Sequence, residues 1–179
     1  WKKFGKTRNL TLYERLNYQN TLINQNTNTR YVVLYTSSSK DVNATMYDRN
    51  SEDLELIVES KNYFYCTNSH DEALYLTAFL NSIYANNIIK DFQTMGDFGP
   101  RDIHRRILKL PLDKFNTKNP DHIKISNLAQ KCKTKAEEII KKYKIKNLKP
   151  NELGKIRLDI RSGIKIELTQ IDKIFTSLF

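Results

Sequence analysis

Short apolar runs typical of β-strands occur in the first part of the chain. Residues 31–35 (YVVLY) combine β-branched and aromatic side chains between polar flanks, which predicts a strand. Residues 43–47 form a weaker candidate of the same kind. The runs 54–59 and 63–67 flank a short polar connector at 60–62, so we expect them to form a β-hairpin.

Apolar residues at helical spacing follow this predicted hairpin. The sequence Ser69-His-Asp-Glu72 matches a capping box, in which the serine and glutamate side chains accept hydrogen bonds from backbone N–H groups that a helix start leaves unpaired. One apolar face then continues through Leu76, Phe79, Leu80, Ile83 and Tyr84. This pattern predicts one helix that ends near Lys90.

The periodicity fades between residues 91 and 120, which indicates a loop with a short strand at 107–112. Asn119-Pro120 marks the start of a second helix, because proline is tolerated in the first turn. Its apolar residues alternate with lysines, so one face should be buried and the other basic. A further helix should begin at Lys149-Pro150, and Gly163 should separate it from a last amphipathic segment. We therefore expect an α+β fold, with a mixed α/β unit at 1–115 and a helical region at 116–179 packing on it.

The composition is that of a globular protein with a strongly basic C-terminal part. The 179 residues are 39% hydrophobic and carry a net charge of +10. Residues 1–110 hold 14 basic and 12 acidic residues, whereas residues 111–179 hold 16 and 8. Lysines are densest between Lys131 and Lys149, where they either follow a phosphate strand or are simply solvated. No apolar run approaches the length of a membrane helix, so we expect no membrane contact.

The familiar catalytic and metal-binding motifs are missing from the sequence. Gly96-Asp-Phe-Gly99 lacks the length and the lysine of a phosphate-binding loop, and the other kinase motifs that Asp97-Phe98-Gly99 would require are absent. The three histidines are scattered, so we expect no metal site. The two cysteines lie far apart and indicate buried thiols in a reducing cytoplasm. Catalysis by this chain alone is not expected.

An arginine- and histidine-rich segment is the most unusual feature of the chain. Four basic residues lie close together in the sequence after Gly99-Pro100: Arg101, His104, Arg105 and Arg106. Glycine permits unusual backbone angles and proline fixes φ, so this dipeptide should fix the local path of the chain. Arginine can bind phosphate, or the O6 and N7 atoms of guanine, in a bidentate manner. The alternative is a structural turn in which Arg101 pairs with Asp97 or Asp102. Tyrosines such as Tyr13 could stack on bases, although tyrosines in strands are more often core residues.

Residues 98–115 (FGPRDIHRRILKLPLDKF) resemble the C-terminal region of restriction-modification N6-adenine DNA methyltransferases, in which a TaqI-like specificity domain follows the catalytic domain. Supporting matches occur in order along most of the chain: Leu12–Tyr18, Tyr63–Thr67 with Asp71–Leu76, Leu80–Ser82, Asn119–His122 and Leu128–Cys132. The resemblance implies a target-recognition domain that binds duplex DNA and supplies sequence specificity. Arg101, His104, Arg105 and Arg106 are then the candidate DNA contacts, with Tyr13 and Arg15 as further candidates.

The resemblance also implies partners outside this chain. The target adenine would be flipped into a separate catalytic domain of the same parent protein, which would bind S-adenosylmethionine. That domain is expected before Trp1, in keeping with the missing initiator methionine, and the parent could also cleave DNA as a type II restriction enzyme. Two other functions remain open. One is a helical interaction module with an exposed apolar patch on residues 165–179, and the other is an RNA-binding or nuclease domain.

Overall fold

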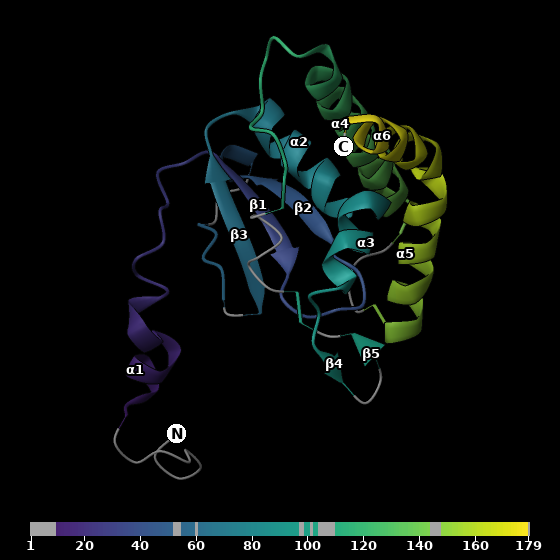
Figure 1. The fold of residues 1–179 in the computed structure, drawn as a ribbon. Coiled ribbons are helices and arrows are strands. Elements are labelled where there is room, and N and C mark those ends of the chain that lie inside the picture. Colours follow the sequence, from purple (N-terminus) through teal and green to yellow (C-terminus); the bar gives the residue numbers. More distant parts are fainter. Residues whose placement is uncertain are drawn as a thin grey trace.

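The computed structural model describes residues 10–51, 55–59, 61–96, 99–100, 102–103, 110–143 and 148–178. Within these residues the fold is α+β, with a three-stranded antiparallel sheet and a helical C-terminal part (Figure 1), which confirms the predicted class. The elements are α1 (Leu12–Leu16), β1 (Tyr31–Thr36), β2 (Ala44–Asp48), β3 (Asn62–Thr67), α2 (His70–Asn81), α3 (Ile83–Lys90), β4 (Met95–Gly96), β5 (Gly99–Pro100), α4 (Pro120–Lys141), α5 (Pro150–Gly163) and α6 (Lys165–Leu178). Short 3-10 helices occupy Tyr18–Asn20 and Arg49–Ser51.

The sheet has the order β2-β1-β3, with the most apolar strand in the centre. The strands predicted at 31–35, 43–47 and 63–67 are confirmed, but the predicted hairpin of 54–59 with 63–67 is wrong. Strand β3 pairs with β1, with Val33 opposite Tyr65, and residues 55–59 form no strand. In β1 the neighbouring residues Tyr31, Val32 and Val33 are all buried, and because successive side chains point to opposite faces, both faces of the strand are covered. This explains why β1 is a continuous apolar run rather than an alternating one.

Side chains, not a strand ladder, hold residues 55–59. The Gln25 amide nitrogen donates to the carbonyl of Val58 at 2.6 Å, and its amide oxygen accepts from the Val58 N–H at 2.8 Å. The Arg49 guanidinium donates to the carbonyl of Leu56 at 2.8 Å and also pairs with Glu55. These contacts satisfy backbone groups that the predicted hairpin would have paired.

The predicted helix from 70 to 90 is interrupted at Ser82, so it forms two helices. Ser82 adopts an extended conformation, and its hydroxyl accepts from the N–H of Ala85 at 3.1 Å. The carboxylate of Asp172, from the distant helix α6, accepts from the N–H of Ile83 at 2.7 Å. Two caps therefore start α3 where the apolar periodicity alone predicted a continuous helix.

The predicted capping box at the start of α2 is only half present. The Ser69 hydroxyl accepts from the N–H of Glu72 at 3.2 Å, as expected. The Glu72 carboxylate instead accepts from the Thr67 hydroxyl, whose oxygen accepts from the N–H of Ser69 at 3.1 Å. Thr67 thus takes the place of the glutamate as acceptor for the Ser69 N–H.

Helices α4 and α5 begin where Asn119-Pro120 and Lys149-Pro150 predicted, and Gly163 separates α5 from α6 as expected. Asn119 caps α4 by accepting from the N–H of Asp121 at 2.9 Å, and Gly163 ends α5. A Cβ atom at Gly163 would lie 2.5 Å from Cδ1 of Ile139, so glycine permits the close approach of α5 to α4. Residues 110–112 form no strand, and the rest of the strand predicted at 107–112 lies outside the described residues.

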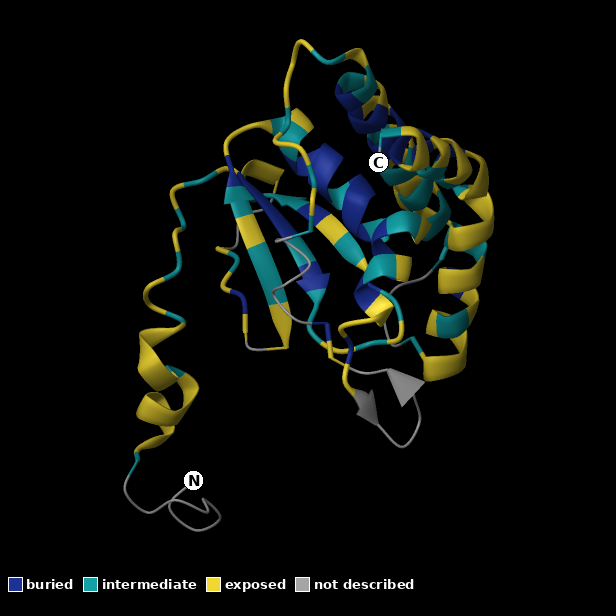
Figure 2. Cartoon of the chain, in the orientation of Figure 1, coloured by how far each residue is buried: buried dark blue, intermediate teal, exposed yellow. Residues whose placement is uncertain are grey.

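One buried cluster joins the sheet, α2 and the C-terminal helices. Helix α2 packs on one face of the sheet, and α4 and α6 pack on the other side of α2 (Figure 1). The cluster includes Tyr35 from β1, Phe79 from α2, Ile125 from α4 and Phe175 from α6. Figure 2 shows this burial in dark blue along α2, whereas α1 and the outer side of α5 are largely exposed. The predicted boundary between 1–115 and 116–179 stays a prediction, and residues on both sides of it share this core.

Candidate nucleic-acid interface

The arginine-rich segment is anchored to the sheet by a residue inside it. Arg101, His104, Arg105 and Arg106 lie outside the described residues, but Asp102 and Ile103 between them are described. The Ile103 side chain is 0% exposed, and its N–H donates to the carbonyl of Ser37 at 2.9 Å. Asp102 forms a β-bridge with Ser38. Residues 102 and 103 of the segment therefore lie beside the residues that follow the end of β1.

Ser37 joins this segment to the start of β3. Its N–H and its hydroxyl both donate to the carbonyl of Lys61, at 3.3 and 2.7 Å. Lys61 is exposed, as is Lys40 in the loop between β1 and β2. Neither lysine belongs to a basic run, so neither is distinguished in the sequence. Only the pairing of β1 with β3 places Lys61 beside Ser37.

Three carboxylates at this end of the sheet have partners within the chain. Asp41 lies 4.0 Å from the ammonium of Lys90, and the Glu59 carboxylate accepts from the N–H of Lys61 at 3.2 Å. Asp102 accepts from the Thr94 hydroxyl at 2.6 Å. The alternative in which Arg101 pairs with Asp102 stays open, since Arg101 is outside the described residues.

Tyr13 and Arg15 lie on α1, apart from the segment around Ile103. Tyr13 is 83% exposed and Arg15 is also exposed. Figure 1 shows α1 standing away from the sheet and from β4 and β5. A complete capping box stabilises this short helix, because Thr11 and Glu14 each accept the other's backbone N–H, at 3.2 and 2.6 Å. The hydrogen bond from the Thr11 backbone lowers the pKa of Glu14.

Two lysines of the basic stretch on α4 are engaged by carboxylates. Lys133 pairs with Glu137 on the same helix, and Lys135 lies 2.7 Å from Glu167 of α6. The bond from Lys135 lowers the pKa of the buried Glu167 carboxyl. Burial raises the pKa of the neighbouring Cys132 thiol to about 11, which keeps it protonated. Lys144 and Lys146 lie outside the described residues.

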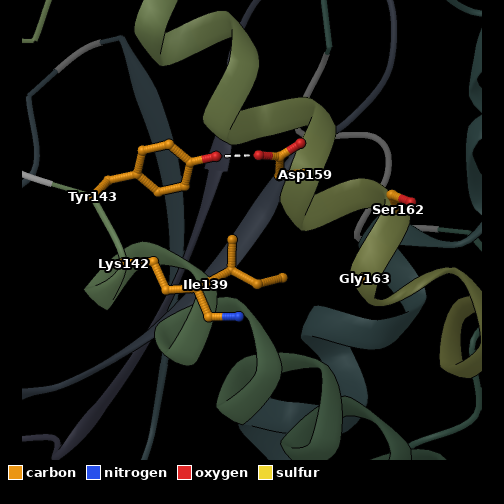
Figure 3. A pocket seen from close by; sticks show the side chains of 6 residues that line it. All are labelled: Ile139, Lys142, Tyr143, Asp159, Ser162 and Gly163. Carbon is orange, nitrogen blue, oxygen red and sulfur yellow. Dashed lines mark hydrogen bonds between the residues drawn. The ribbon is translucent and has the colours of Figure 1, made fainter.

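An open pocket of about 540 Å³ lies where the ends of α4 and α5 meet (Figure 3). It is lined by Ile139, Lys142, Tyr143, Asp159, Ser162 and Gly163. The Tyr143 hydroxyl donates to the Asp159 carboxylate, and this bond raises the pKa of Tyr143. This hydrogen bond joins the two helix ends. Because the hydroxyl and the carboxylate are partners of each other, the pair gives no indication of a ligand site.

Comparison of the chain with protein-family models, curated proteins and solved structures found no match. Within the part of the chain that the structure describes, no three His, Cys, Asp or Glu side chains form a group that could hold a metal ion. No helix of that part is long and apolar enough to cross a membrane. S-adenosylmethionine was expected only in a separate catalytic domain, so that expectation stays a prediction, as does a cytoplasmic location.

Proposed function

We propose that this chain is a DNA target-recognition domain, which binds duplex DNA and supplies sequence specificity to an N6-adenine DNA methyltransferase of the restriction-modification class. The observation that supports this most directly is the anchoring of Ile103. A buried isoleucine, tied to Ser37, lies between Arg101 and His104 in the sequence. Because consecutive Cα atoms are about 3.8 Å apart, this anchor limits the region that the neighbouring basic residues reach.

A fixed attachment matters because base recognition depends on the position of a side chain, not only on its charge. Phosphate contacts set the register of a protein on DNA, and base contacts provide the sequence information. The net charge of +10 supports a general attraction to a polyanion. In the proposed parent enzyme, methyl transfer takes place in a separate domain that binds S-adenosylmethionine and receives the flipped adenine.

The helical interaction module has less support from the described residues. Helix α6 directs Ile171, Ile174 and Phe175 into the shared core. Ile166 at its start is the large apolar side chain of α6 that stays exposed. An assembly surface on residues 165–178 would therefore have little apolar area.

Duplex binding at several salt concentrations tests the proposed function. We expect the affinity to fall steeply with salt, and the variants Arg101→Ala and Arg105→Ala to weaken binding. The double variant Lys124→Ala/Lys173→Ala, which removes two exposed charges elsewhere, serves as the matched control. The measurement is made on the chain and on the protein encoded by the complete reading frame. Binding that is absent or insensitive to salt in both would reject the proposal.

A further inference from the structure

Helix α5 lies on the outside of the protein and packs against α4 and α6 through one side. Ile156 is its single buried residue, and Figure 2 shows most of the rest exposed. Successive residues of a helix are rotated by about 100°. On that basis the side opposite Ile156 carries Gly154, Leu158 and Arg161, with Lys155 and Arg157 at its margins. We call this surface, formed by residues 154, 155, 157, 158 and 161, the α5 outer face.

The α5 outer face has positive charge and no carboxylate. The two acidic residues of α5, Glu152 and Asp159, lie toward the side of Ile156 and are already bonded. Glu152 accepts from the N–H of Lys149 at 2.7 Å, and Asp159 accepts from the Tyr143 hydroxyl. Among the described residues, no carboxylate forms an ion pair with Lys155, Arg157 or Arg161. This distinguishes the face from α4, where Lys133 and Lys135 are paired.

Gly154 provides a second, independent observation. A Cβ atom at this position would meet no atom within 4 Å, so packing within the chain does not require glycine there. Glycine lowers the stability of a helix interior because it loses more backbone freedom on folding. Packing within the chain does not account for this glycine. Its missing side chain leaves room for the backbone of another molecule to approach α5 closely.

We propose that the α5 outer face binds the phosphodiester backbone of duplex DNA. This inference rests on the proposed function, because it takes the same duplex as its ligand. Arg157 and Arg161 are one turn apart, a rise of about 6 Å, and one DNA strand presents a phosphate about every 3.4 Å along the axis. The first turn of α5 lies at the lower end of Figure 1, where β4 and β5 also lie. A duplex along α5 therefore runs toward the end of the molecule where β4 and β5 lie.

The test compares two double variants of the chain by fluorescence anisotropy with one duplex between 50 and 200 mM salt. Arg157→Gln/Arg161→Gln removes two charges from the α5 outer face, and Lys124→Gln/Lys173→Gln removes two charges from α4 and α6. If each arginine contacts one phosphate, the slope of log affinity against log salt becomes shallower by about 1.8 in the first variant. The control variant keeps the wild-type slope. Both changes are at exposed positions, so both variants should keep the wild-type Tm.

Gly154→Gln gives a separate steric test without a change of charge. We expect this variant to raise the Tm, because glutamine is the better helix former, and to weaken DNA binding. The inference is overturned if the wild-type chain binds DNA and both Arg157→Gln/Arg161→Gln and Gly154→Gln bind as tightly as it does. In that case Arg101→Ala still reports on the proposed function. If neither the wild-type chain nor the protein encoded by the complete reading frame binds DNA at 50 mM salt, the proposed function and this inference are both rejected.

Discussion

The N–H of Ile103 and the carbonyl of Ser37 are joined by a 2.9 Å hydrogen bond, which ties the arginine-rich segment to the residue that follows β1. The Ile103 side chain is part of the buried core. Replacing it with alanine should lower the free energy of unfolding by about 2–5 kcal/mol, and replacing it with valine by about 0.5–1.5 kcal/mol. Urea unfolding measures both.

The same two variants connect the anchor with DNA binding. We expect Ile103→Val to bind DNA like the wild type, and Ile103→Ala to bind more weakly under conditions where circular dichroism shows it still folded. The anchoring argument fails if a folded Ile103→Ala variant keeps the wild-type affinity.

His122 is a buried acceptor at the start of α4. It is 2% exposed, its Nδ1 accepts from the N–H of Asn116 at 3.1 Å, and its Nε2 lies 3.5 Å from the Tyr75 hydroxyl. His122→Phe keeps an aromatic ring but leaves the Asn116 N–H without this acceptor, so we expect a loss of about 1–3 kcal/mol. His122→Asn, whose side-chain oxygen can replace Nδ1, should recover part of the hydrogen-bond loss. Equal urea midpoints for the two variants would argue against this role.

Tyr75 provides a milder change in the same cluster. Burial raises the pKa of Tyr75 to about 12, so its phenol stays protonated at neutral pH. Tyr75→Phe removes one long hydrogen bond and should cost no more than about 1 kcal/mol. A larger loss in thermal unfolding would mean that this hydroxyl holds His122 in place.

Asp172 of α6 caps α3 across the core. Its carboxylate accepts from the N–H of Ile83 at 2.7 Å, and burial raises the pKa of this group. Asp172→Ala removes the cap and should lower stability by about 0.5–2 kcal/mol. Asp172→Asn keeps an oxygen acceptor without a charge to desolvate, so we expect a smaller loss. Lys173→Ala, at the next and exposed position, is the control for loss of a side chain on α6.

The pair between Glu167 and Lys135 should make stability depend on pH. The bond from Lys135 lowers the pKa of Glu167 in the folded state. The carboxylate therefore stabilises the fold above the ordinary glutamate pKa of about 4.3, and this contribution is lost as the pH falls through the lowered value. Glu167→Gln should be less stable than the wild type at pH 7, with a smaller difference at pH 3. Glu137→Gln, in an exposed pair with Lys133, should change stability little at either pH.

Local sequence signals predicted most helices and strands. The break between α2 and α3 and the pairing of β3 depend on residues far away in the sequence, so local signals did not predict them. Asn119-Pro120 and Gly163 fix helix ends through their own backbone, so these boundaries were predicted correctly. The break at Ser82 depends partly on Asp172, which lies far along the chain. The hairpin prediction failed because neighbouring runs need not pair, and here the partner of β3 is the earlier strand β1.

Only part of the candidate site could be predicted, because the rest also depends on contacts between residues that are distant in the sequence. Counting charge drew attention to the lysines between 131 and 149, but a count does not show that Lys133 and Lys135 have carboxylate partners. The α5 outer face was missed, although the helical positions of Glu152 and Asp159 relative to Ile156 could have revealed it. In the sequence Ile103 is one residue of a basic segment, and only the structure shows that its apolar side chain is buried in the core.

The hydrogen bonds between Gln25 and Val58 have a consequence for local opening. The Gln25 side chain pairs with one backbone residue and does not form part of a strand ladder. Residues 55–59 can therefore separate from the rest of the protein when the hydrogen bonds of Gln25 and Arg49 break. The amides of β1 are instead covered by strands on both sides. The amide hydrogen of Val58, bonded to Gln25, is therefore expected to exchange with solvent through a local opening, whereas those at the centre of β1 exchange only when the whole sheet unfolds.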